Sequence, residues 1–79
     1  MPTVFKLEPL AIDVRTTTDT LHVVLADGRE ISVPLAWFPR LLNAKEEQQR
    51  QWRLIGGGIG IHWPLIDEDI SVESLLAIK

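Results

Sequence analysis

The sequence predicts a single small domain of the α+β class, in which an antiparallel meander comes first and helical segments follow. Three observations support this prediction. The chain has 79 residues, 46% of them hydrophobic and 24% charged, which is enough for one hydrophobic core but not for two. Side chains alternate with period two through residues 12–33, as in strands with one buried face. Apolar residues then recur at helical spacing between residues 36 and 53.

The meander is predicted to contain three strands joined by two tight turns. Residues 12–16 and 21–26 alternate between an apolar and a mostly polar face, and the alternation resumes at Ile31. Thr18-Asp19-Thr20 is expected to turn the first pair. Asp27-Gly28 supplies the positive φ angles that a tight hairpin requires. The three strands should therefore pair antiparallel over residues 12–33.

Residues 1–11 are expected to form an N-terminal arm, outside a single domain that spans residues 12–79. The first nine residues mix apolar Val4, Phe5 and Leu7 with two charged residues and two prolines. A loosely attached arm and a short edge strand both fit this composition.

A helical segment is predicted over residues 36–53. Its first part begins near Ala36 or Pro39, because apolar residues at positions 37, 38, 41 and 42 would share one helical face. Asn43 stands three residues before Glu46, which fits a variant of the capping box. A second, mostly exposed helix is therefore expected over residues 44–52, ending in a buried Trp52.

The last third of the chain is predicted to form a glycine-jointed hairpin and a terminal helix. The hairpin covers residues 54–63 around Gly56-Gly57-Gly58, and Pro64 ends it. The acidic run Asp67-Glu68-Asp69 is expected to lead into the helix, with Ser71 as its N-cap. The predicted core consists of the inward-facing residues of all these elements: Ile12, Val14, Leu21, Val23, Leu25, Ile31, Val33, Phe38, Leu41, Trp52, Ile61, Leu75 and Leu76.

Charge and composition exclude several classes of function. The net charge of −3 argues against a general polyanion binder, although residues 40–53 carry more basic than acidic side chains. The sequence contains no cysteine, which excludes disulfides, thiolate zinc sites and cysteine nucleophiles. No signal-peptide pattern and no apolar run of about 20 residues is present, so we expect a cytoplasmic protein without a membrane partner.

The sequence gives little support for catalysis or cofactor binding. The glycines at positions 56–58 and 60 lack the spacing of a nucleotide-binding loop, and we expect them to let the backbone pass close to Trp37 or Trp52. No Gly-x-Ser-x-Gly elbow is present, and a core this small leaves little room for a pocket. We therefore assign no catalytic residue, no cofactor and no metal. The alternative is a small metal-dependent enzyme or ligand-binding domain centred on His62, Asp67 and Asp69.

A binding surface is the remaining candidate, because Trp and Arg dominate the hot spots of protein interfaces. Trp37 and Trp52 are expected to be core residues, whereas Trp63 is expected to expose one face. The candidate partner-binding residues come from the basic stretch and its surroundings: Trp37, Arg40, Arg50, Arg53, His62 and Trp63.

Three segments are distinctive in combination: VPLAWFPRL at 33–41, GIHWP at 60–64 and DEDISV at 67–72. Together with the DGRE turn at 27–30, they resemble the bacterial domain of unknown function family 2442 over about residues 12–77. The resemblance implies an α+β domain, sometimes followed by a helix-turn-helix domain and sometimes encoded beside a small protein linked to toxin–antitoxin pairs. No residues follow Lys79 for such a DNA-binding domain, so we expect no direct contact with nucleic acid.

These observations favour a non-enzymatic interaction module. It would be a homodimer, or the antitoxin-like or regulatory partner of a neighbouring gene product.

Overall fold

The computed structural model describes residues 8–77 and contains two antiparallel sheets of three strands each, joined by short helices. The first sheet has the order β1-β2-β3, formed by β1 (Ala11–Thr16), β2 (Thr20–Leu25) and β3 (Glu30–Pro34). The second has the order β4-β5-β6, formed by β4 (Arg53–Ile55), β5 (Gly60–Trp63) and β6 (Glu68–Ser71). The helical elements are the 3₁₀ turn η1 (Leu35–Trp37), α1 (Pro39–Leu42), α2 (Glu46–Gln49) and α3 (Val72–Ala77). The predicted α+β class is confirmed.

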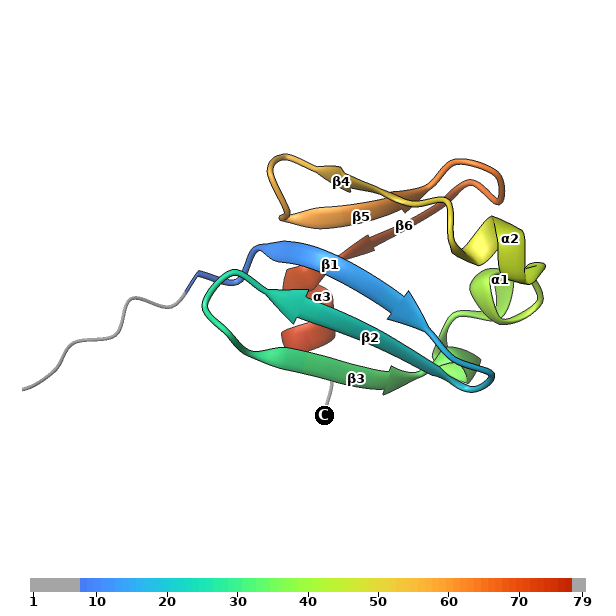
Figure 1. Cartoon of the computed structure of the whole chain (residues 1–79), viewed down its shortest axis with the longest axis horizontal. Helices are drawn as coiled ribbons and strands as arrows, with labels where there is room; N and C mark the ends of the chain where they lie inside the picture. Colours follow the sequence, from blue (N-terminus) through green and yellow to red (C-terminus); the bar gives the residue numbers. More distant parts are fainter. Residues whose placement is uncertain (1–7, 78–79) are drawn as a thin grey trace, which may run out of the picture.

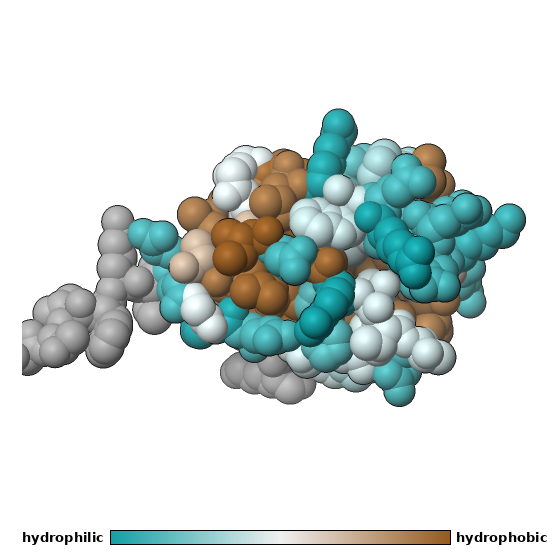
Figure 2. All heavy atoms as spheres, viewed as in Figure 1, coloured by the Kyte–Doolittle hydropathy of each residue, from teal (hydrophilic) through white to brown (hydrophobic). Residues whose placement is uncertain are grey.

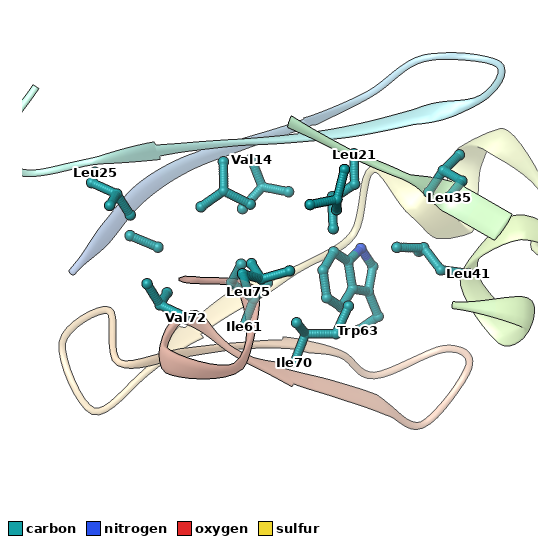
Figure 3. Close-up of a cluster of buried hydrophobic side chains, with 13 residues drawn as sticks. Val14, Leu21, Leu25, Leu35, Leu41, Ile61, Trp63, Ile70, Val72 and Leu75 are labelled. Carbon is teal, nitrogen blue, oxygen red and sulfur yellow. The ribbon is translucent and has the colours of Figure 1, made fainter. Parts of the chain in front are cut away.

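The two sheets form opposite layers around one core (Figures 1 and 3). The second sheet and α3 cover the inner face of the first sheet, while α1 and α2 lie at one end of the molecule (Figure 1). Side chains from both layers meet between them (Figure 3). Each sheet therefore buries one face and leaves the other to solvent.

The predicted meander is present. β2 pairs antiparallel with both β1 and β3, with Leu21 opposite Val33 and Val23 opposite Ile31. The β2–β3 turn uses Gly28 at φ 93°, as predicted, but Asp27 does not have the positive φ that the sequence also assigned to it. Residues 1–7 of the predicted arm lie outside the described residues, and Ala11, at its end, is the first residue of β1.

A β-bulge at the start of β1 reverses the predicted orientation of Ile12. The register shifts between Ala11 and Asp13, so that Ala11 lies opposite Leu25 and Asp13 opposite Val24. Ala11 is fully buried, and the side chain of Ile12 is turned outward and is 56% exposed. The prediction of Ile12 as a core residue is therefore wrong, because simple alternation does not register an inserted residue.

The predicted helical segment is broken into three single turns. Asn43 does not begin a helix; it has αR angles and its N–H donates to the carbonyl of Pro39, so that it ends α1. α2 starts after Lys45, whose N–H donates to Oε1 of Gln48 at 2.8 Å. The predicted helix over 44–52 is thus wrong at both ends. Trp52 follows α2 in the segment before β4 and is half-buried.

The predicted hairpin at residues 54–63 is confirmed as β4 and β5, but the acidic run after it forms an unexpected strand. Residues 68–71 pair with β5, and Ile70 lies opposite Ile61. Ile70 is 3% exposed and is the apolar side chain that ties β6 to the core. The expected helix lead-in is therefore wrong, because a four-residue strand with one inward apolar residue gives almost no periodic signal.

The terminal helix α3 begins where the sequence predicts. The hydroxyl of Ser71 accepts the N–H of Ser74 at 3.1 Å, which confirms Ser71 as the capping residue. Val72 and Leu75 are buried, but Leu76 is 42% exposed, so its assignment to the core is wrong. In a helix of six residues, positions three apart face the sheet and the next position does not.

The core contains most of the predicted residues and one large side chain that was expected to expose one face. Trp63 is fully buried between the layers, and its indole N–H donates to the carbonyl of Gln49 at 3.1 Å (Figure 3). Ile31, Phe38 and Trp52 are only partly buried against the core. The buried hydrophobic residues are Ala11, Val14, Leu21, Val23, Leu25, Val33, Leu35, Leu41, Ile61, Trp63, Ile70, Val72 and Leu75.

No helix within residues 8–77 is long and apolar enough to cross a membrane.

Candidate functional site

The outer face of the second sheet carries a row of three polar residues, one from each strand. Arg53 of β4 lies opposite His62 of β5, which lies opposite Asp69 of β6. Nδ1 of His62 is paired with Oδ1 of Asp69, and the histidine side chain is only 17% exposed. The guanidinium group of Arg53 is exposed and has no hydrogen bond or ion pair within residues 8–77. The row thus presents a free cation on one side of the histidine and a carboxylate on the other.

The metal or acid–base alternative requires Asp67 beside this pair, and the structure places it elsewhere. Asp67 lies in the turn before β6 at φ 52°, where its backbone carbonyl accepts Nη1 of Arg40 at 2.8 Å. Across the described residues, no three His, Asp or Glu side chains converge as metal ligands. His22 lies on the other sheet, with Nδ1 2.8 Å from the hydroxyl of Ser32. His62 and Asp69 therefore form a pair without a third ligand.

The predicted basic patch with an exposed Trp63 does not exist in that form. Trp63 is fully buried, whereas Trp37, expected in the core, is 48% exposed on η1. Pro34 and Pro39 flank a turn too short to bury both neighbouring aromatic rings, and it is Phe38 that packs against the core. The arginines also lie on different elements. Arg40 binds the Asp67 carbonyl, and Arg50 pairs with Glu46 within its own helical turn.

A groove lined by aliphatic side chains lies at the end of the molecule where β1 begins, and sequence reasoning did not find it. We call it the aliphatic groove. It consists of two hollows, of about 410 and 220 Å³, that share Ile59 and Ser71. The first is completed by Pro9, Leu10, Glu73 and Leu76, and the second by Ile55, Gly60, Asp69 and Ile70. Apolar side chains gather in this part of the surface, over the start of β1 and the turn end of the β4–β5 hairpin (Figure 2).

The glycine loop between β4 and β5 holds Ile59 in the groove. Gly58 has φ 118° and lies so close to β1 that a Cβ atom there would be 2.5 Å from the carbonyl oxygen of Ala11. The carbonyl of Gly58 accepts the N–H of Ala11 at 2.7 Å, and that of Ile59 accepts the N–H of Val72 at 3.0 Å. The close approach that the glycines permit is therefore to β1, not to Trp37 or Trp52 as predicted. The sequence signal for the groove was the pair of isoleucines that flank the glycine run. From the sequence alone, we interpret that segment only as a turn.

A polar cleft of about 340 Å³ lies at the opposite end, between the β1–β2 turn and α2. It is lined by Thr16, Thr17, Thr18, Glu46 and Gln49. Gln49 is already engaged, because its amide donates to the carbonyl of Leu41 at 2.8 Å. The cleft therefore presents hydroxyls and one carboxylate, without a cluster of groups that would bind a charged ligand.

Among residues 8–77, Asp27 is the titratable group whose pKa clearly departs from its ordinary value, and its contacts are structural. Asp27 accepts hydrogen bonds from Nε of Arg29 at 2.9 Å, from the backbone N–H of Arg29 at 3.1 Å and from that of Glu8 at 3.0 Å. The side-chain bond from Arg29 is the main cause that lowers the pKa of Asp27 below its ordinary value. This carboxylate fixes the β2–β3 turn and the entry to β1 instead of serving a site.

Comparison with known proteins places the chain within a family. A family described as "Protein of unknown function (DUF2442)" matches residues 11–79. The fold also resembles a crystal structure of a protein of unknown function from Rhodospirillum rubrum, with a TM-score of 0.74 and 27% sequence identity. That alignment covers 86% of this chain and 84% of the other. No curated protein matches the sequence. Since the family match spans nearly the whole domain, this chain belongs to the DUF2442 family, as its distinctive segments predicted.

Proposed function

We propose that this protein is a non-enzymatic interaction module that binds another protein. The observation that carries the proposal is the aliphatic groove, where Ile55, Ile59 and Leu76 are 40%, 58% and 42% exposed. Large exposed aliphatic side chains that gather along one groove of a small domain are typical of protein-binding surfaces. The His62–Asp69 pair supports metal chemistry less well, because it has no third ligand within the described residues.

The family resemblance supports the product of a neighbouring reading frame as the partner, with an antitoxin-like or regulatory role for this chain. A homodimer is the alternative assembly. The proposal also retains the cytoplasmic location expected from the sequence, which subcellular fractionation would check.

The test is co-expression of the full chain with the product of the adjacent reading frame, followed by size-exclusion chromatography with light scattering. We expect a complex of fixed stoichiometry, while the chain alone is measured over a range of concentrations to detect self-association. A chain that remains monomeric throughout and leaves the neighbouring product unbound would contradict the proposal.

Among the residues that the sequence identified, Trp37, Arg40 and Arg53 remain accessible candidates for contact with the partner. Guanidinium groups pair with carboxylates in two parallel bonds, so Arg53 would meet an acidic group of the partner. Arg53→Ala should weaken the complex by about 1 kcal/mol or more, with an almost unchanged melting temperature. Arg50→Ala is the matched control, because Arg50 is already paired with Glu46.

A further inference from the structure

We infer that the aliphatic groove receives an amphipathic segment of a partner protein, one that presents aliphatic side chains next to lysine or arginine. The inference rests on the proposed function and specifies the chemistry of the partner at this site. Three properties of the groove support it: its walls, its fixed backbone and its charge.

The walls of the groove suit branched aliphatic side chains. Ile59 separates the two hollows and is 58% exposed, although the carbonyl before it and its own carbonyl are both hydrogen-bonded to neighbouring elements. Gly60 lines the smaller hollow, where a Cβ atom would lie 3.4 Å from the carbonyl oxygen of Ile70 and 3.8 Å from the side chain of Ile55. Two separate hollows of this kind fit two side chains of one segment.

The backbone around the groove is fixed before any partner binds. The glycine loop is tied to β1 through Ala11 and to α3 through Val72, as the two hydrogen bonds described above show. Backbone hydrogen bonds thus connect the loop to both β1 and α3 at residues 58 and 59. A preformed site loses less conformational entropy on binding, which favours a specific partner over nonspecific adhesion.

The charge of the groove is negative. Glu73 and Asp69 are its only charged lining residues, and no Lys or Arg among the described residues lines either hollow. Glu73 has no hydrogen bond or ion pair through its carboxylate within residues 8–77, and Asp69 remains 68% exposed beside His62. A basic group on the incoming segment would therefore meet the unpaired carboxylate of Glu73 at the larger hollow. At the smaller hollow it would meet the exposed carboxylate of Asp69, which is also paired with His62.

The same charges disfavour a second copy of this chain as the occupant. A symmetric dimer brings the same patch of both subunits together, so Glu73 and Asp69 would face like charges across the interface. The net charge of −3 on each chain adds to this repulsion. A basic partner would instead be attracted both by the two carboxylates of the groove and by the net negative charge of the chain.

The experiment is selection of peptides from a random displayed library on the full chain, followed by calorimetric titration of the enriched peptides. We expect the enriched peptides to combine aliphatic residues with lysine or arginine. Ile59→Ser should weaken their binding by about tenfold or more, because it removes the wall shared by both hollows. Ile12→Ser is the matched control; Ile12 is 56% exposed, lies outside the groove, and its replacement should change affinity by less than about twofold.

A second pair of variants tests the charge. Glu73→Gln should reduce the affinity of the same peptides and the salt dependence of their association, whereas Glu47→Gln on α2 should change neither. Acidic or uncharged enriched peptides, or binding that survives Ile59→Ser, would overturn the inference.

Two other outcomes would assign the groove to a different occupant. Dimerisation that Ile59→Ser abolishes would assign it to a second copy of this chain. Peptide binding that appears only after removal of residues 1–7 would assign it to the chain's own N-terminal segment. If the co-expressed partner binds and Ile59→Ser leaves that complex intact, the inference fails while the proposed function stands.

Discussion

Trp63 and Trp37 occupy opposite environments, although Trp63 ends β5 and Trp37 follows β3 by only three residues. The indole of Trp63 lies between the two layers and is fully buried, whereas that of Trp37 projects from η1 and is 48% exposed. Trp63→Ala should reduce the free energy of unfolding by about 3–5 kcal/mol, because it removes the largest buried side chain and leaves a cavity. Urea denaturation measures the loss, with Trp37→Ala as the control. Equal losses for the two variants would show that their burial is misassigned.

Asp27 gives the domain a predictable response to acid. Since its pKa is lowered in the folded state, the carboxylate stabilises the fold above its unfolded pKa, and this contribution is lost as the pH falls through the folded pKa. Asp27→Asn should therefore lower the melting temperature at neutral pH and flatten its decline in acid. Thermal denaturation at a series of pH values checks this, with Asp13→Asn on the exposed face of β1 as the control. A decline in acid that is as steep in Asp27→Asn as in the parent would refute the assignment.

His62 and Asp69 predict weak metal binding, because two ligands without a third seldom hold a divalent ion at low concentration. Native mass spectrometry with added Zn²⁺, Mg²⁺ or Mn²⁺ should show no specific one-to-one adduct. An adduct that forms and disappears in His62→Ala would favour the metal-dependent alternative.

At the scale of the elements, the loop between β4 and β5 determines how the hairpin joins β1. Gly58→Ala should destabilise the fold by about 1–3 kcal/mol, since the residue would have a strained φ and its Cβ would collide with the backbone of Ala11. Gly57→Ala is the control for conformation alone, because Gly57 also has a positive φ but has open space around it. Denaturation curves give the two losses, and hydrogen exchange at the Ala11 amide reports whether the contact persists. Equal losses would mean that the close approach contributes nothing.

The elements that the sequence predicted correctly are those with strong local signals. The meander has long alternation and an Asp-Gly turn, and α3 has a serine cap. The elements that were wrong depend on contacts distant in sequence. β6 is a strand because Ile70 packs opposite Ile61, and α2 stops at Gln49, the residue whose carbonyl accepts the indole N–H of Trp63.

At the scale of the whole molecule, the sequence predicted one core and its approximate membership but not which side chains remain outside it. The bulge at Ala11 exposes Ile12, and the short α3 exposes Leu76. The aliphatic groove could not be predicted, because it depends on the approach of the glycine loop, α3 and the segment before β1. The row of Arg53, His62 and Asp69 likewise depends on β6, a strand that could not be predicted because its sequence reads as an acidic run before a helix.

The three tryptophans also allow conformational changes of the protein to be followed by its intrinsic fluorescence. Trp63 is sealed between the layers, Trp52 is half-buried beside β4, and Trp37 is open to solvent. Because indole emission shifts to the red as water reaches the ring, the native spectrum is a sum of three environments. Iodide in solution would quench the fluorescence of Trp37 first, and that of Trp63 would be quenched only after the two layers separate. Fluorescence quenching can therefore distinguish a change at the η1 end, such as a partner that covers Trp37, from opening of the core.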